Sequence, residues 1–129
     1  MTQRKVKFRA WETVSQSMVS WKELLPELSR ILASTKQKNI IIMQSAGIKD
    51  KKGKEIYEGD IVKFNLGREC MLVCSVNWST RRASFYLAEH GDERCDGNDH
   101  FTLTSIRPDY YEVIGNIYKN PKLLVVADK

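Results

Sequence analysis

The residues with the greatest chemical potential lie in one short stretch, Glu89–His100 (EHGDERCDGNDH). Its twelve residues hold five carboxylates, both histidines of the chain and one cysteine. A calcium loop starting at Asp92 would put Arg94 and Leu103 at positions three and twelve, where oxygen ligands belong. Zinc could use His90, Cys95 and His100, but no Cys-x-x-Cys pair stands nearby to complete the set. We therefore favour an acidic loop between two strands, with metal binding left open.

The rest of the sequence shows little sign of enzymatic activity. The sequence has no G-x-S-x-G, P-loop, H-E-x-x-H or G-x-G-x-x-G motif. Cys74 lies on the expected apolar face of a strand and fits a small core residue better than a nucleophile. We expect a protein that is not an enzyme, with no cofactor, no metal and no small-molecule substrate.

Basic side chains form a second candidate site, for an anionic partner such as a nucleic acid. They lie on one side of an N-terminal strand, around Gly53 in the stretch IKDKKGKEIYEGDIVKF, and in a later turn: Lys5, Lys7, Arg9, Lys49, Lys51, Lys52, Lys54, Arg81 and Arg82. Lysines would neutralise phosphates, and Trp11 and Trp21 could stack on bases. The alternative is that these lysines only solvate turns and protect strand edges from aggregation.

Charge is unevenly distributed along the chain. Residues 1–54 hold 12 Lys/Arg and 4 Asp/Glu, a balance of +8, whereas residues 55–129 hold 9 and 12, a balance of −3. Such a molecule can attract an anionic partner to one end, or it can associate with its own copies, basic surface on acidic surface. A protein-interaction role with homo-oligomeric assembly is our first expectation, and nucleic-acid binding is the alternative.

The elements that must position these residues begin with a hairpin and a helix. Residues 5–11 alternate polar and apolar, which predicts a strand with Lys5, Lys7 and Arg9 facing outward, and residues 18–21 supply its hairpin partner. In LLPELSRILAS, five apolar residues at helical spacing predict a helix with one apolar stripe: Leu24, Leu25, Leu28, Ile31 and Leu32. A buried strand is expected at residues 39–44. These elements make up a predicted N-terminal region, residues 1–45.

Residues 46–129 are predicted to form a second, all-β domain. Five short strands are expected at residues 61–64, 70–78, 83–88, 101–106 and 111–118. Close spacing of this kind favours a small antiparallel barrel, and we expect an SH3-like barrel, so the chain is mainly β (α+β). Its expected core is Val62, Phe64, Leu72, Val76, Phe85, Leu87, Val113 and Ile117.

Three cysteines, Cys70, Cys74 and Cys95, are too few and too odd in number for a disulfide framework. The longest apolar runs have four residues, whereas a bilayer-spanning helix needs about 20. The start of the chain lacks the apolar segment of a secretory signal. We expect a cytoplasmic protein with reduced thiols and no membrane partner.

Three stretches in order, KFRAWE, MQSAGIKDKKGKEIYEGDIVKF and EVIGNIYKNPKLL, resemble the YopX-like family of small phage and prophage proteins. They bracket the chain from about residue 6 to residue 124. The resemblance implies an SH3-like barrel, an N-terminal hairpin and helix, assembly into homo-oligomers and a mobile-element origin. It carries over no catalytic residue, because the family's biochemical role is not established. Ala46 departs from the Thr or similar residue expected there, and residues 79–100 have no counterpart.

Overall fold

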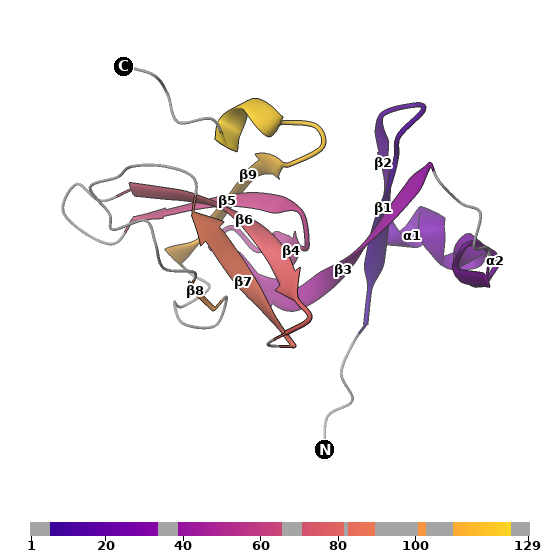
Figure 1. Cartoon of the computed structure of the whole chain (residues 1–129), viewed down its shortest axis with the longest axis horizontal. Helices are drawn as coiled ribbons and strands as arrows, with labels where there is room; N and C mark the ends of the chain where they lie inside the picture. The colour runs from indigo at the N-terminus through magenta and orange to yellow at the C-terminus, as the bar shows by residue number, and fades with distance from the viewer. Residues whose placement is uncertain are drawn as a thin grey trace.

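The described residues form two antiparallel sheets. This computed structural model describes residues 6–33, 39–65, 71–81, 83–89, 101–102 and 110–124. The N-terminal sheet has the strand order β2-β1-β3-β4, and the C-terminal sheet has the order β8-β7-β6-β5-β9. Figure 1 shows the two sheets side by side, with β3 crossing from one to the other. The chain is therefore mainly β with one short helical segment, as the sequence predicted.

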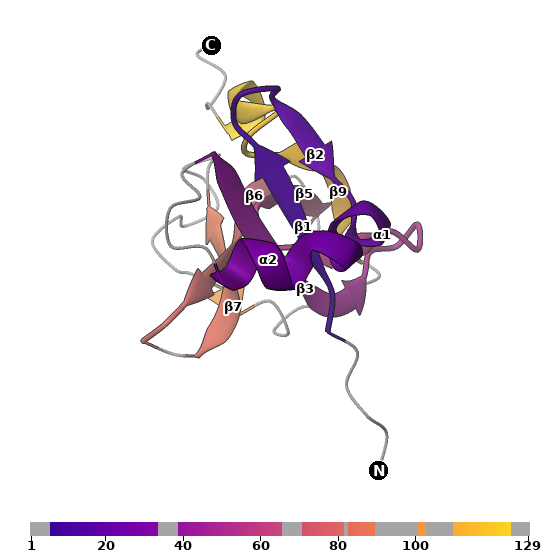
Figure 2. The same ribbon diagram turned by 90° about the vertical axis from the view of Figure 1, so that its right-hand side faces the viewer.

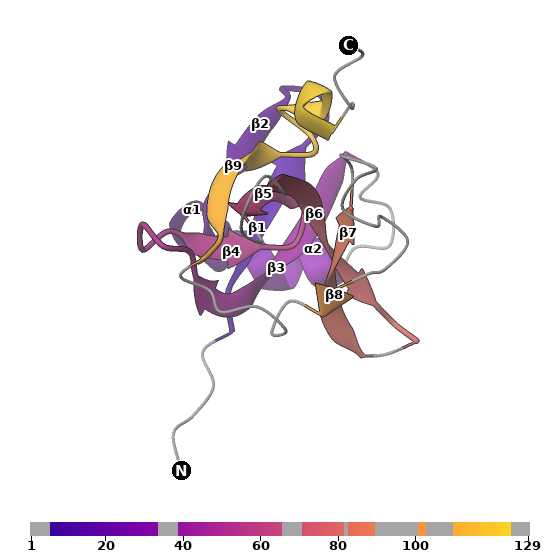
Figure 3. The same ribbon diagram turned by 90° about the vertical axis from the view of Figure 1, so that its left-hand side faces the viewer.

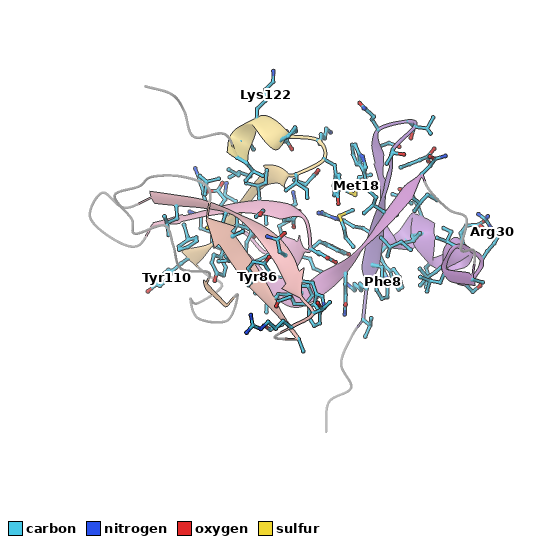
Figure 4. The ribbon with its side chains drawn as sticks, viewed as in Figure 1. Phe8, Met18, Arg30, Tyr86, Tyr110 and Lys122 are labelled. Atoms are coloured by element: carbon cyan, nitrogen blue, oxygen red, sulfur yellow. The ribbon has the colours of Figure 1, made fainter. Side chains whose placement is uncertain are left out.

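The N-terminal sheet begins with the predicted hairpin. β1 (Phe8–Glu12) pairs antiparallel with β2 (Ser17–Val19), with Trp11 opposite Met18, and pairs on its other side with β3 (Ile40–Lys49), with Trp11 opposite Ile41. Alternation along β1 sends Phe8 and Ala10 toward the helix and Arg9 and Trp11 toward the C-terminal sheet. Figure 4 shows Met18 on that same side of β2.

A continuous helical segment covers the other face of this sheet: α1 (Trp21–Leu24), η1 (Leu25–Glu27) and α2 (Leu28–Ala33). Figure 2 shows it lying across β1 and β3. It begins at Trp21, three residues before the predicted stretch starts at Leu24, because Ser20 and Glu23 form a capping box. Leu24 and Ile31 are buried and Leu28 packs beside them.

The single apolar stripe predicted for this helix is wrong. Leu25 and Leu32 are 52% and 60% exposed, on the side turned away from the sheet. The five apolar residues span too wide an arc for one sheet to cover. The helix consequently presents apolar side chains on two sides.

β3 is longer than predicted and belongs to both parts of the molecule. Its first half pairs with β1, and its second half pairs with β4 (Glu55–Tyr57), a strand that was not predicted. Ala46 and Ile48 pack against the core of the C-terminal sheet. The predicted boundary between residues 45 and 46 thus falls inside β3, and the division into two domains stays a prediction.

The C-terminal sheet contains the five strands expected from residue 61 onward. They are β5 (Asp60–Asn65), β6 (Met71–Ser79), β7 (Ser84–Glu89), β8 (Phe101–Thr102) and β9 (Glu112–Asn116). The last strand, β9, returns beside the first, β5, and the sheet curls strongly (Figure 3). After β9, η5 (Pro121–Leu124) lies over β6. Predicted strand residues 103–106 lie outside the described residues.

The core inside this curl agrees with most of the predicted list. Val62, Phe64, Leu72, Val76 and Leu87 are buried, and Phe85 and Val113 pack against them. Ile56, Cys74 and Tyr111 complete the buried cluster. Ile117 does not belong to it, because β9 ends at Asn116 and the chain turns there. In the described part of the chain, no helix is both long enough and apolar enough to cross a membrane.

Candidate functional site

The lysine turn, residues 49–54, joins β3 to β4 and is held from inside by Asp50. Its Oδ1 accepts hydrogen bonds from the backbone N–H groups of Lys52 and Lys54 at 2.9 and 2.8 Å, and its Oδ2 accepts one from Val113 at 2.9 Å. Burial raises the pKa of Asp50, but these three donors and the charge of Lys54 outweigh it, so the pKa lies below the ordinary value. The turn is therefore docked onto β9.

Glu112 on β9 neutralises much of the positive charge of this turn. Its carboxylate lies 3.5 Å from Lys51 Nζ, 3.0 Å from Lys52 Nζ and 3.9 Å from Lys63 Nζ. The hydrogen bond from Lys52, followed by the charges of all three lysines, holds the pKa of Glu112 below its ordinary value. Three lysines share one carboxylate, so the surface keeps a positive excess that is smaller than the sequence suggests.

The remaining predicted contact residues do not gather into one patch. Lys7 pairs with Glu55 at 3.2 Å, Lys49 and Lys54 are exposed near the turn, and Arg81 lies in the β6–β7 turn. Figures 2 and 3 show the β3–β4 turn and the β6–β7 hairpin at opposite sides of the molecule. Lys5 and Arg82 lie outside the described residues.

The prediction that Arg9 faces solvent is wrong. Its side chain is 11% exposed and lies between the two sheets, where an Nη pairs with Asp60 Oδ1 at 2.8 Å and donates to the Glu58 carbonyl at 3.3 Å. The guanidinium also stands 4.8 Å from the centre of the Tyr57 ring, a cation–π contact. The C-terminal sheet packs over this side of β1, so Arg9 is a contact between sheets and leaves the candidate anion-binding set.

This junction between the sheets, made of Arg9, Trp11, Tyr57, Asp60 and Tyr118, is electrostatically unusual. The Asp60 side chain is 2% exposed. Burial raises its pKa, against the lowering effects of Arg9 and of the Tyr57 N–H that donates to Oδ2 at 2.8 Å. Burial likewise raises the pKa values of Tyr57 and Tyr118. Among described atoms, Arg9 Nε has no hydrogen-bond partner.

The three stretches that carry the family resemblance meet at this junction. Arg9 and Trp11 come from KFRAWE, Tyr57 and Asp60 from the middle stretch, and Tyr118 from the last. The Trp11 and Tyr118 rings stack with centroids 5.7 Å apart, and Trp11 is 6% exposed, which corrects its expected role as a free stacking surface. Nothing in the sequence links Arg9 to Asp60, because the two residues are 51 positions apart; only the fold brings them together.

A pocket of about 170 Å³ lies between the helical segment and the N-terminal sheet. Its floor is apolar, from Ala10, Val19, Leu24, Ile31 and Ile40, and its rim carries Glu12, Glu23, Glu27 and Arg30. Glu27 and Arg30 pair with each other at 2.7 Å, and Glu23 is engaged with Ser20 in the capping box. Figure 4 shows Arg30 on the outer side of α2.

Residues 90–100, which make up most of the predicted acidic stretch with its possible metal ligands, lie outside the described residues. Elsewhere in the described chain, no three His, Cys, Asp or Glu side chains gather as a metal site would require. Cys74 is buried in the core of the C-terminal sheet, as the sequence predicted for a small core residue.

The sequence matches a known protein family, and the fold is similar to two solved structures. A model of the YopX protein family matches residues 7–125. The structure is similar to that of protein EF1440 from Enterococcus faecalis, with a TM-score of 0.62, 22% identity, and coverage of 95% of this chain and 99% of that chain. It is also similar to YopX from Bacillus subtilis, with a TM-score of 0.58, 22% identity, and coverage of 92% and 95%. No curated protein matches the sequence. At this identity the two structures show a shared fold and nothing more.

Proposed function

Because the chain belongs to the YopX protein family, a family of unknown function, we propose its role from its own surfaces: a non-enzymatic protein that acts by homo-oligomeric assembly. The proposal includes a phage or prophage origin and a place in the cytoplasm of the bacterial host cell, both implied by the resemblance. No cofactor or small-molecule substrate takes part in it.

The observation that carries the proposal is the outward apolar side of the helical segment. Leu25 and Leu32 are seven positions apart, about two helical turns, so they lie on the same side of the helix. Both are more than half exposed, while Leu24 and Ile31 already cover the sheet. Apolar side chains on the free side of a helix are suited to packing against the same side of a second copy across a two-fold axis.

Sedimentation velocity at low and high salt tests this assembly. We expect the protein to form one defined oligomer that persists at high salt, because burial of leucine does not depend on ionic strength. The double variant Leu25→Gln/Leu32→Gln should sediment as a monomer of 14.9 kDa. Loss of two buried leucine contacts per protomer removes about 3 to 6 kcal/mol from the interface.

The matched control is Val14→Gln, which changes a 74% exposed valine at the tip of the β1–β2 hairpin. This variant should assemble like the unmodified chain. A monomer at high protein concentration would overturn the proposed assembly, and equal dissociation of both variants would remove the helix from the interface.

The alternative function is nucleic-acid binding by the basic surface. The lysine turn favours it, since Lys51, Lys52 and Lys63 share the single carboxylate of Glu112. Against it, Arg9 is buried and Lys7 is paired. Variants of the lysine turn serve as one arm of the binding experiment described below, which tests this alternative directly.

For the C-terminal sheet we propose the finer description of an SH3-like barrel. Its support is the strand order, in which the last strand β9 returns to pair with the first strand β5. The curl of the sheet around Phe64, Leu72, Leu87 and Tyr111 agrees with a small barrel filled by its own side chains.

A further inference from the structure

An exposed aromatic pair lies at the end of the β6–β7 hairpin. Trp78 and Phe85 are paired across the two strands, with ring centroids 4.9 Å apart and planes at 71°. Phe85 packs against the core, but Trp78 is 41% exposed. Leu72, Cys74 and Val76 precede Trp78 on the same side of β6 and are all buried, so Trp78 is the point where the inner face of the sheet reaches solvent.

Close to its turn, the same hairpin carries only positive charge. From residue 70 to residue 88 the sequence has two arginines, Arg81 and Arg82, and no aspartate or glutamate, whereas Glu89 lies at the end of β7 away from the turn. Arg81 is exposed and makes no ion pair with any residue that the structure describes. The lysine turn is different, because two carboxylates offset its charge: Asp50 lies within the turn, and Glu112 on β9 lies against it. The hairpin is therefore the basic turn whose charge the described fold leaves uncompensated.

The aromatic pair and Arg81 lie within a few residues of the same turn. Ser79 pairs with Ser84 on either side of the turn, and Ala83, just before Ser84, adopts a left-handed backbone with φ of 51°. This conformation costs an L-residue about 1–2 kcal/mol, and it returns the chain so that Phe85 lies opposite Trp78. Figures 1 and 3 show the hairpin projecting beyond the rest of the sheet, where an extended partner can approach it.

From these observations we propose that the tip of the β6–β7 hairpin binds single-stranded nucleic acid. An unpaired base stacks on the exposed Trp78 indole beside Phe85, and Arg81 neutralises an adjacent phosphate. A duplex would bury its base faces in its own stack, so the exposed indole favours a single strand. This site lies apart from the leucine surface and does not depend on assembly.

Fluorescence anisotropy tests the site on the full chain, with a labelled oligothymidine of about 20 nucleotides. This length exceeds the usual binding site of small proteins that bind single strands. We expect binding at low salt that weakens as salt rises. Trp78→Leu should lower affinity at least fivefold, whereas Trp78→Phe, which keeps an aromatic face, should keep most of it. Arg81→Gln should lower affinity and reduce the salt dependence by about one contact.

A second readout reports stacking itself. Trp11 is buried and Trp21 is half-buried, so Trp78, which is 41% exposed, should supply much of the long-wavelength emission, and the unlabelled oligonucleotide should quench it. Trp78→Phe should abolish that quenching while binding persists. If Trp78→Leu proves unfolded by circular dichroism, Trp78→Phe and the arginine variant carry the test.

The matched control is Lys51→Gln/Lys52→Gln in the lysine turn, together with a duplex of the same length. Unchanged affinity of this control and weaker binding of the duplex are the results expected. Absence of any binding at low salt would overturn the proposal. So would loss of binding in the lysine control with no loss in the hairpin variants, a result that supports the basic turn instead. Binding of an acidic peptide as tightly as the oligonucleotide would also overturn it.

Discussion

At the scale of single residues, Asp50 decides the shape of the lysine turn. One carboxylate accepts three backbone hydrogen bonds, two from its own turn and one from Val113 on β9. Because these donors favour the charged form, the pKa of Asp50 lies below its ordinary value of 3.8 despite burial. The lysines thus surround a fixed negative charge, which explains how so many of them fit around one turn.

Asp50→Asn should therefore destabilise the protein at neutral pH by about 1–3 kcal/mol. An asparagine can accept from Lys52 and Lys54, but its NH₂ group would then face the Val113 N–H donor. The pKa is depressed in the folded state, so this stabilisation is fully present above pH 3.8 and is lost as pH falls through the lower folded value. Urea unfolding of both proteins at pH 7 and below pH 3 should show the difference shrinking in acid. Glu112→Gln, which removes the carboxylate that three surface lysines share, is the control and should cost less than Asp50→Asn.

At the scale of elements, the short turn between β4 and β5 fixes how the two sheets meet. Gly59 donates its N–H to the Val76 carbonyl, and its own carbonyl accepts from Ile117. Its φ is +87°, and a Cβ there would lie 2.9 Å from Met43 Sδ of the N-terminal sheet and 3.5 Å from the Tyr118 ring. The turn needs glycine for its backbone and also for the close approach of its neighbours.

Comparison of Gly59→Ala with Gly53→Ala separates those two demands. Both glycines have positive φ, so each alanine costs about 1–2 kcal/mol in backbone strain. Only Gly59 has neighbours within 4 Å, since a Cβ at Gly53 would point into open space. Gly59→Ala should therefore be less stable than Gly53→Ala by about 1–3 kcal/mol in urea unfolding. Equal stabilities would mean that the Met43 and Tyr118 side chains move aside for the new Cβ without a loss of stability.

Element type was largely predictable from local pattern, whereas contacts between elements were not. Alternation and spacing gave the hairpin and the five C-terminal strands, and the Ser20–Glu23 capping box could also have given the true start of the helix. β4 was missed because Glu55–Tyr57 offers only three residues of pattern. Alternation in β1 correctly separated Arg9 from Ala10, but it could not reveal that a second sheet would cover the polar side. The sequence did not single out Trp78 as an exposed aromatic residue, because a period of two says nothing about where a sheet ends.

At the scale of the whole molecule, the Arg9–Asp60 pair couples the two sheets. Asp60 begins β5, and Arg9 lies in β1. Their side chains are 2% and 11% exposed, so both charges are largely shielded from solvent. Removal of one partner from a buried pair leaves an uncompensated charge, which typically costs about 3–5 kcal/mol. The pair therefore sets the orientation of the sheets more strongly than a surface contact such as Lys7–Glu55, whose loss should cost less than about 1 kcal/mol.

A double-mutant cycle with Arg9→Met and Asp60→Asn measures this coupling. Met keeps a stem that packs on Tyr57, and Asn keeps an acceptor for the Tyr57 N–H. Each single variant should lose about 3–5 kcal/mol, and the double variant should lose less than the sum by at least about 1 kcal/mol. Additive losses would show that the two charges do not stabilise each other, and Lys7→Met serves as the exposed control.

The pH dependence of Arg9→Met supplies an independent check on the same pair. Burial already raises the folded-state pKa of Asp60 above 3.8, and loss of the Arg9 charge removes its largest opposing influence, so the pKa should rise further. A carboxyl whose folded pKa lies above its unfolded value binds protons more readily in the folded state. Its contribution is thus most favourable below pH 3.8 and is lost as pH rises through the raised folded value. The penalty of Arg9→Met relative to the unmodified chain should consequently be largest at neutral pH and shrink on acidification. A penalty that stays constant from pH 7 to pH 4 would mean that Asp60 is not the buried charge that Arg9 neutralises.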